Sequence, residues 1–533
     1  MRRMSTMTSL AAIFSVVVVV LSGYSMRGAN KGRNDQFGTV SFPTSCSPQA
    51  QPLIEKGVAQ LHSFQYQQSE ATFTQATEAD SQCAIPYWGR AMSLYHQLWD
   101  FPSADTLAKG RDYIAQAQKL IEKSPREADY IAAAAAFYQE GSKLSHTDRI
   151  EAYSRSIEKL HRDFPDDGEG AAFYALSLVS LADHKDELVN RKKAIAILDP
   201  LFDQHPDNPG DAHYLIHATD TPELASQGLA AARHYAQIAP DSSHALHMPS
   251  HIFVRLGLWQ ESIDSNIAAA AAAAKATQAH EADAGYQLHA MDFLNYSYLQ
   301  SGQEGRARQV IADLKSVPGA ASDELAEHES WFASRDALEL HRWKDAASLP
   351  IPNLEISRLD ATYLVRTIGC ARTGDAKAGS AELKKLNEAL SAQHHEMTTM
   401  GYASSSSRST EQDEGQAWVE FAEGKKDAAL KRLRAAADRQ DASGVDSLTM
   451  PAREMLGDML LELKRPSEAL DAYRTALKES PNRFDALWGA AQAAQLAGDA
   501  TAAKGYYAKL VEVSGSAADR PELQEARGYL ASK

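Results

Sequence analysis

The sequence is poor in cysteine and in clustered positive charge, and each absence narrows the possible functions. Three cysteines in 533 residues form no paired CxxC motif, which disfavours the redox and zinc modules built on that spacing. The 54 Lys and Arg residues are interspersed among 70 Asp and Glu residues. Because phosphate binding needs a clustered cationic surface, no nucleic acid partner is expected. Glycine-rich phosphate loops and the serine elbow of hydrolases are also missing.

Long apolar runs are confined to the N-terminus. Arg2 and Arg3 form a short basic start, residues 10–21 are apolar, and residues 22–25 include small side chains suited to cleavage. Residues 10–21 are too short a stretch to span a bilayer comfortably, so we predict a cleaved signal peptide at residues 1–25. The mature protein is expected to be exported to a periplasmic or extracellular space, without stable insertion in a membrane.

The few cysteines have distinct expected roles. Cys46 precedes the first expected helical hairpin and Cys83 follows it, so their side chains can meet and pair in an oxidising compartment. Cys370 lies in the apolar stretch 363–370 and is expected to be a small core residue.

Helix-forming residues are abundant, and no sustained alternation of β-branched residues follows the N-terminus, so we predict an all-α protein. A spaced pattern near the C-terminus comprises Gly457, Leu460, Ala469, Tyr473, Ala476 and Pro481. It recurs one repeat later at Leu487, Ala491, Ala503, Tyr507 and Leu510. In these positions the chain resembles the tetratricopeptide repeat (TPR) family. The resemblance implies a right-handed α-solenoid of antiparallel helix pairs.

This pattern divides the chain into a predicted series of segments. In the middle, one repeat is expected at 209–242, the next at 243–276, and a third at 288–321 after an insertion. The predicted organisation is a signal peptide at 1–25, a flexible N-terminal segment at 26–45, a TPR-like solenoid with a histidine-lined groove at 46–400, a polar loop at 401–411 and a C-terminal TPR block at 412–533.

Histidines concentrate in the three middle repeats. In TPR proteins, positions 2, 5 and 9 of the first helix of a repeat face the concave groove, so the resemblance implies a shared location for these side chains. His213 and His217 occupy positions 5 and 9 of the first of these repeats. His244, His247 and His251 occupy positions 2, 5 and 9 of the second. His289, Asp292 and Tyr296 occupy the same three positions of the third.

Such a cluster is typical of a metal site. Histidines at i and i+4, as in His213 and His217, can reach one ion from a helix. The glutamate of the HExxH protease motif is absent, since Tyr214 stands in its place, so any general base must lie elsewhere. Asp292 is the nearest predicted carboxylate and Asp220 lies toward the outer end of the groove. Each can serve as a ligand, a base or an acceptor that orients an imidazole.

The sequence leaves the ligand of the cluster open. Zinc, copper, iron and manganese all suit imidazole with one carboxylate, and export favours zinc or copper. A polar or proton-handling groove without metal and a chance grouping are the alternatives. Pro249 either kinks a helix between His247 and His251 or begins a new one.

A wider resemblance covers the chain from about Cys46 onward. The blocks Trp88-Gly-Arg-Ala-Met, His213 to His217 and His244 to His251 are similar to those of exported bacterial TPR proteins with an HxxHMPSH motif. No established reaction accompanies this group. We therefore predict an exported binding or scaffold protein that holds a protein or peptide in its groove and a metal at the histidines. A metal-dependent hydrolase or oxidase is the alternative.

Overall fold

The computed structural model describes residues 37–98, 102–120, 124–139, 144–182, 186–399, 409–444 and 448–532. The predicted signal peptide lies outside these residues. The described parts of the chain are all-α and contain no β-strand, as predicted. From Gln36 onward the chain forms one compact unit. None of the described helices is long and apolar enough to cross a bilayer.

The N-terminal helices precede the expected histidine repeats. They are α1 (Gln51–His62), α2 (Tyr66–Ala79), α3 (Ile85–Met92), α4 (Ala104–Leu120), α5 (Pro125–Tyr138), α6 (His146–Asp163), α7 (Gly168–Ala182) and α8 (Glu187–Gln204).

The middle helices coincide closely with the repeats expected at 209–242, 243–276 and 288–321. They are α9 (Pro209–Thr219), η1 (Ala225–Gly228), α10 (Leu229–Ile238), α11 (Ser243–His247), α12 (Pro249–Arg255), α13 (Trp259–Gln278), α14 (Gly285–Gln300), α15 (Glu304–Asp313) and η2 (Leu314–Ser316).

The remaining helices complete the chain. They are α16 (Ser322–Glu339), α17 (Trp343–Ala347), η3 (Ile356–Arg358), α18 (Asp360–Arg372), α19 (Ala376–Thr399), α20 (Thr410–Ala422), α21 (Lys426–Ser443), α22 (Ala452–Glu462), α23 (Pro466–Glu479), α24 (Phe484–Leu496), α25 (Ala500–Val513) and α26 (Glu522–Ala531).

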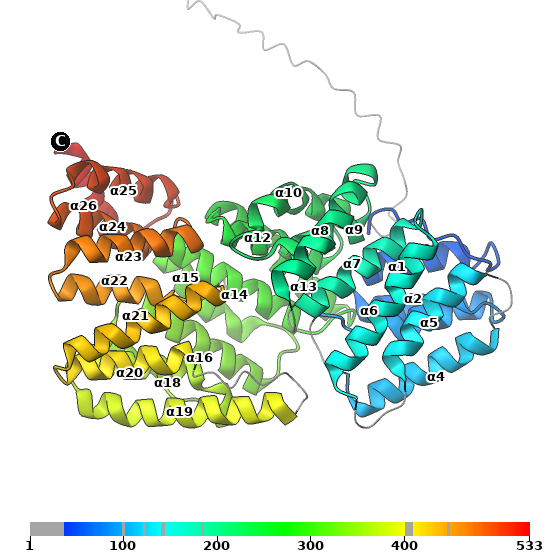
Figure 1. The fold of residues 1–533 in the computed structure, drawn as a ribbon, viewed down its shortest axis with the longest axis horizontal. Helices are drawn as coiled ribbons and strands as arrows, with labels where there is room; N and C mark the ends of the chain where they lie inside the picture. The colour runs from blue at the N-terminus through cyan, green and yellow to red at the C-terminus, as the bar shows by residue number, and fades with distance from the viewer. Residues whose placement is uncertain are drawn as a thin grey trace, which may run out of the picture. The chain divides into compact units, whose positions relative to one another are not determined.

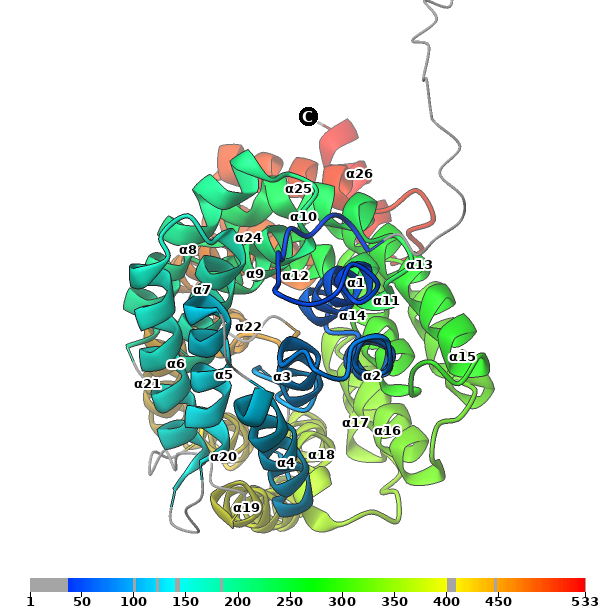
Figure 2. The same ribbon diagram turned by 90° about the vertical axis from the view of Figure 1, so that its right-hand side faces the viewer.

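Successive helices pack against one another in pairs, as the ladder from α20 to α25 shows in Figure 1. Seen from the side, α5 to α8 lie along one side and α13, α15 and α16 along the other (Figure 2). The pairing follows from sequence, because small residues let neighbouring helices approach closely. Gly457 and Gly489, for example, both face the ring of Tyr473, and a Cβ at either position would lie within 2.6 Å of that ring.

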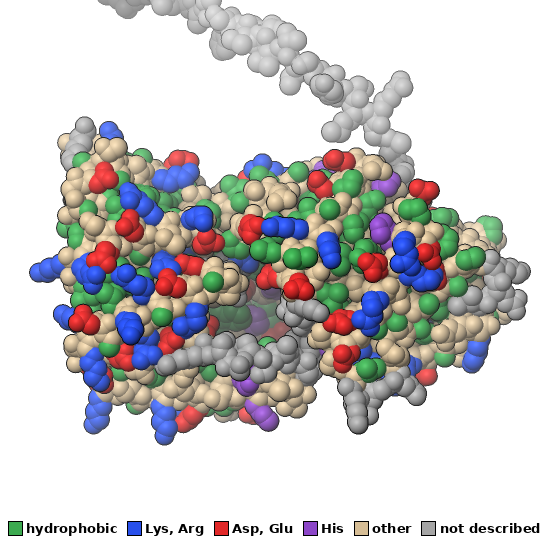
Figure 3. Space-filling model, in the orientation of Figure 1, with side chains coloured by type: hydrophobic (Ala, Val, Ile, Leu, Met, Phe, Trp, Pro, Cys, Tyr) green, Lys and Arg blue, Asp and Glu red, His purple; other side chains and the backbone are tan. Residues whose placement is uncertain are grey.

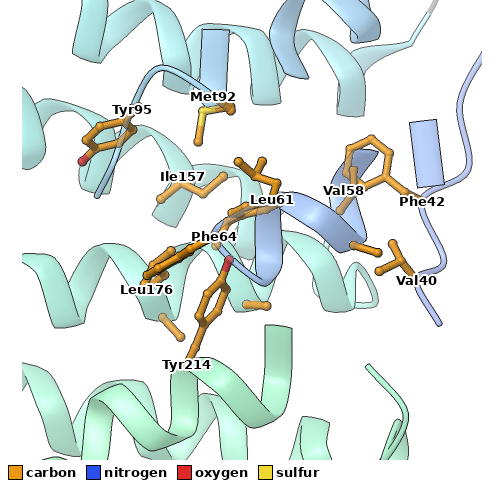
Figure 4. Close-up of a cluster of buried hydrophobic side chains, with 14 of the residues drawn as sticks. Val40, Phe42, Val58, Leu61, Phe64, Met92, Tyr95, Ile157, Leu176 and Tyr214 are labelled. Atoms are coloured by element: carbon orange, nitrogen blue, oxygen red, sulfur yellow. The ribbon is translucent and has the colours of Figure 1, made fainter. Parts of the chain in front are cut away.

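One hydrophobic core joins the N-terminal helices to the middle repeats. It runs from Phe37 to Phe253, and Figure 4 shows Phe64, Leu61 and Tyr214 meeting within it. Phe42, which lies within the segment 26–45 expected to be flexible, is completely buried in this core. The predicted disulfide is confirmed: Cys46 and Cys83 are bonded, with Cα atoms 5.2 Å apart. Cys370 is a buried free thiol, also as predicted.

A second core covers the C-terminal half. It extends from Ala337 to Ala503 and includes buried side chains on both sides of residues 401–411. Residues 400–408 lie outside the described residues, and α20 begins at Thr410, within the expected polar loop. The helices before and after this loop therefore share one core.

Candidate metal centre

Four helices bring the six predicted histidines together. His213 and His217 lie on α9, His244 and His247 on α11, His251 on α12, and His289 on α14. Capping residues in the sequence fix where the first two of these helices, α9 and α11, begin. Asn208 caps α9 through Gly210 N–H, with Pro209 as its first residue, and Ser242 caps α11 through Ala245 N–H.

Pro249 is the first residue of α12, so the structure selects the second of the two predicted roles. Met248 alone separates α11 from α12, and its backbone is helical with φ −53° and ψ −34°. The missing amide of Pro249 therefore divides one helical path into two pieces without changing its course abruptly. His247 and His251 stay within reach of each other across this division.

The histidines form two triads rather than one site. His213, His217 and His244 make the first triad, and His247, His251 and His289 the second. Within each triad, one ring nitrogen from every residue lies within 4.8 Å of the others. Both triads follow the same rule: positions 5 and 9 of one repeat combine with position 2 of the next repeat.

Triad 1 is buried beneath the turn between α1 and α2. His213 Nδ1 donates to the carbonyl oxygen of His62 at 2.6 Å, which leaves its Nε2 as a lone-pair acceptor 3.0 Å from His244 Nε2. His217 Nε2 is buried with no hydrogen-bond partner among the described residues. The ring of Phe64 lies 4.4 Å from that of His213 and 5.4 Å from that of His244, between ring centroids.

Triad 2 places two ring nitrogens face to face. His247 Nδ1 lies 2.7 Å from Asn266 Oδ1, whose own amide nitrogen donates to the carbonyl of Ser262. His251 Nδ1 lies 2.8 Å from Asp220 Oδ2. Since both of these partners are acceptors, each Nδ1 is a protonated donor, and the Nε2 of either ring carries a lone pair whenever that ring is neutral. The two Nε2 atoms are 3.1 Å apart.

Burial keeps most of these rings neutral. It lowers the pKa of His213 to about 3, and burial followed by neighbouring histidines lowers the pKa values of His217, His244 and His247 well below their ordinary value. Burial and then His251 lower the pKa of His289 to about 4, although this side chain lines a cavity and is the most exposed of the six. At neutral pH these five imidazoles are uncharged and able to bind a metal ion.

The two triads adjoin each other. The ring centroids of His217 and His251 are 6.3 Å apart, and those of His244 and His247 are also 6.3 Å apart. These spacings between triads equal the widest spacing within triad 1. Figure 3 shows histidine side chains inside the hollow at the middle of the face displayed there.

Asp220 holds His251 in place. Its other carboxylate oxygen accepts from Arg255 Nε at 2.9 Å, so both of its oxygens are engaged. Burial would raise the pKa of Asp220, but the Arg255 guanidinium and His251 outweigh burial and lower it well below its ordinary value. Among the roles predicted for Asp220, the contacts match the acceptor that orients an imidazole.

The structure does not bring Asp292 or Tyr296 into either triad. Asp292 is ion-paired with Arg335 at 2.6 Å, which directs its carboxylate away from the role of metal ligand. Tyr296 is 1% exposed and its hydroxyl accepts from Arg483 Nη1 at 2.6 Å. Residues from the C-terminal repeats therefore cover Tyr296, which the repeat register places on the groove-lining face.

Three residues near the triads were not predicted: His62, Phe64 and Asn266. His62 is the last residue of α1, and Phe64 lies in the turn that follows, with a positive φ of 53°. Gly210 lets this turn approach α9, because a Cβ there would lie 2.6 Å from the His62 ring. Asn266 lies on the second helix of its repeat, so the groove-facing positions gave no signal for it.

Comparison with known proteins bears on the repeats. Residues 415–484 and 454–521 match the tetratricopeptide repeat family. Residues 415–521 therefore carry tetratricopeptide repeats. No curated protein matches the sequence. Among solved structures, the human IFIT1 dimer with m7Gppp-AAAA is similar with a TM-score of 0.34 and 13% identity, over 89% of this chain and 91% of that one. The human IFIT1 dimer with PPP-AAAA gives a TM-score of 0.33 and 14% identity, over 86% and 89%.

The TPR matches cover only the C-terminal part of the chain, whereas the triads lie before it. The middle helices nevertheless keep the same paired arrangement, and this places positions 2, 5 and 9 of adjacent repeats side by side. The paired packing of these adjacent helices therefore explains why the six histidines meet. The comparisons do not indicate the chemistry of the centre.

Proposed function

We propose that this protein is a metal-binding TPR protein that holds two transition-metal ions, one in each histidine triad. The observation that carries the proposal is the pair of Nε2 atoms of His247 and His251, 3.1 Å apart. When both rings are neutral, both present lone pairs there, because each Nδ1 donates elsewhere. Two buried lone pairs that face each other repel, and a metal ion bound by both nitrogens removes this repulsion.

Zinc and copper fit the donor set best. All six donors are imidazole nitrogens, which suit zinc, copper, iron and nickel, and no carboxylate belongs to either triad. The disulfide between Cys46 and Cys83 supports an oxidising compartment, which agrees with the proposed export of the protein. Three protein ligands leave a fourth position for water or another small ligand, as in catalytic zinc sites.

The matching TPR repeats support a second part of the proposal. TPR repeats commonly bind proteins, and we propose that the C-terminal block at 412–533 serves a protein or peptide partner. The six histidines lie outside these matched repeats in sequence, so we propose that partner binding and metal binding use different residues of the chain. A hydrolase or oxidase remains the second candidate function, favoured by the open fourth position at each triad.

Metal stoichiometry tests the two-site proposal. Untagged protein stripped by a chelator and dialysed against Zn²⁺ should bind two equivalents per chain, as measured by elemental analysis. The double variant His213→Gln, His217→Gln should bind one equivalent, and so should His247→Gln, His251→Gln, because each removes two of three ligands from one triad.

The exposed pair His394 and His395 on α19 provides the matched control. Replacing both with glutamine removes the same number of imidazoles far from the triads in sequence and should leave two equivalents. A wild-type protein that binds no zinc at micromolar concentration, or triad variants that still bind two equivalents, would falsify the proposal.

A further inference from the structure

A cavity of about 530 Å³ opens beside both triads. Its lining includes His244 of triad 1 and His289 of triad 2, so one space reaches both candidate metal sites. This volume lies within the range of small-molecule binding pockets. We call it the side cavity.

Departures from the repeat pattern build the side cavity. One wall is the insertion between the second and third middle repeats, which contributes Glu281, Ala282, Asp283 and Tyr286. Another wall is the start of α2 with Tyr66, and a third follows α3 with His96. Stacking of regular helix pairs does not require these irregular segments, whereas binding sites are often formed by such segments.

Aromatic rings form the middle of the side cavity. Tyr66 and His96 stack with ring centroids 4.1 Å apart and planes 19° apart. Tyr286 stands edge-on to His244, with centroids 6.3 Å apart and planes at 75°. Such flat walls favour a planar ring, because aromatic pairs gain from stacked and edge-to-face contact.

The side cavity has two chemically different ends: an inner end at His244 and His289, and an outer end at Glu281 and Asp283. The lining contains the carboxylates of Glu70, Glu281 and Asp283 and no Lys or Arg among the described residues. Glu70 is already paired with Lys109 Nζ at 2.7 Å. Glu281 and Asp283 are exposed on the insertion, so they supply the negative charge that a ligand would meet there.

We propose that the side cavity binds a small aromatic amine, with an oxygen or nitrogen donor directed toward His244 and His289 and an ammonium group beside Glu281 and Asp283. The inner part of this inference rests on the proposed metal centre, whereas the outer part rests on the two carboxylates and the aromatic walls. Small aromatic amines are therefore the proposed class of substrate or ligand for the metal centre.

The test uses two probes of nearly equal size and opposite charge, tyramine and 4-hydroxyphenylacetate. With the zinc-loaded full chain, calorimetry should show tyramine binding about tenfold more tightly, since two partly screened charge pairs favour one probe and oppose the other. Glu281→Gln with Asp283→Asn should reduce this preference to about twofold or less without changing the zinc content.

Blocking the side cavity gives a second test. Ala282→Trp fills the space from the insertion and should abolish tyramine binding, whereas Ala279→Trp, on an exposed residue of the same turn outside the lining, should not. Zinc content is measured for every sample, so failure of the metal-centre proposal can be distinguished from failure of the side-cavity proposal.

Two zinc equivalents with equal binding of both probes would overturn the side-cavity proposal alone. Tyramine binding that Ala282→Trp leaves intact would also overturn it. Loss of zinc binding together with absence of tyramine binding would overturn both proposals. Tyramine binding that depends on Ala282, in a chain that binds no zinc, would retain the amine site and overturn the metal centre.

Discussion

Asn266 decides which nitrogen of His247 faces the candidate metal centre. Its side-chain oxygen accepts from His247 Nδ1, and its amide group is anchored by the carbonyl of Ser262 at 2.8 Å. Asn266 itself is completely buried, so water cannot replace its oxygen without rearrangement. The Asn266 side chain thus fixes the tautomer and the orientation of His247, although Asn266 itself is not part of triad 2.

Asn266→Leu should therefore weaken metal binding at triad 2 while triad 1 keeps its affinity. Loss of such an orienting acceptor costs about tenfold to a hundredfold in affinity. Zinc titration in the His213→Gln, His217→Gln background isolates triad 2 and measures this change. Ser265→Ala is the matched control, because Ser265 bonds the Leu246 carbonyl and contacts no histidine nitrogen. Equal affinities for Asn266→Leu and Ser265→Ala would show that the tautomer of His247 is fixed in another way.

At the scale of helices, the repeat register accounts for what the sequence could predict. Positions 2, 5 and 9 return at each repeat, so the register alone was enough to place His213, His217 and His251 on one surface. The division into two triads was not predicted, because it depends on which rings of adjacent helices approach each other. The pattern also placed Asp292 and Tyr296 there, but later repeats supply Arg335 and Arg483 as their partners.

The turn between α1 and α2 lay beyond prediction for a different reason. It approaches triad 1 from a helix pair far away in sequence, and hydrophobic periodicity does not report such long-range contacts. Phe64 adopts a positive φ of 53°, which a bulky residue rarely does without support from its surroundings. Its ring is 1% exposed and packs against all three histidines of triad 1.

Phe64→Ala should speed the release of metal from triad 1 by about tenfold or more, because removing the ring opens a path for water and chelator. Release into excess chelator is followed in the His247→Gln, His251→Gln background. The same substitution in the His213→Gln, His217→Gln background should leave release from triad 2 unchanged. Phe64→Leu keeps most of the cover and should lie close to wild type. Comparable acceleration at both triads would mean that the substitution loosens the fold generally.

At the scale of the whole chain, Arg483 ties the histidine-bearing helices to the C-terminal repeats. It is completely buried before α24, and it donates to Tyr296 on α14, to Glu339 on α16 at 2.7 Å and to Glu454 on α22 at 2.7 Å. Two carboxylates thus share one guanidinium, and the group would carry a net negative charge if both were ionised. Burial raises the pKa of Glu454, outweighing the opposite effect of Arg483.

This raised pKa makes stability depend on pH in one direction. The unfolded chain releases the Glu454 proton as the pH rises above about 4.5, whereas the folded chain retains it. Folding stability is therefore lost as the pH rises from that value through the folded pKa, by about 1.4 kcal/mol for each pH unit. In Glu454→Gln the amide oxygen can still accept a hydrogen bond from Arg483, but the side chain no longer binds or releases a proton.

Glu454→Gln should consequently match wild type near pH 4.5 and become the more stable protein as the pH rises toward 8. Melting temperatures measured across this range test the difference, with Glu462→Gln as control, since Glu462 lies on the same helix but is exposed. The difference between Glu462→Gln and wild type should not grow in this way. If Glu454→Gln is destabilised equally at every pH, the ionised carboxylate contributes attraction to Arg483 that exceeds its repulsion from Glu339. The link between the two halves of the chain would then depend on both charges.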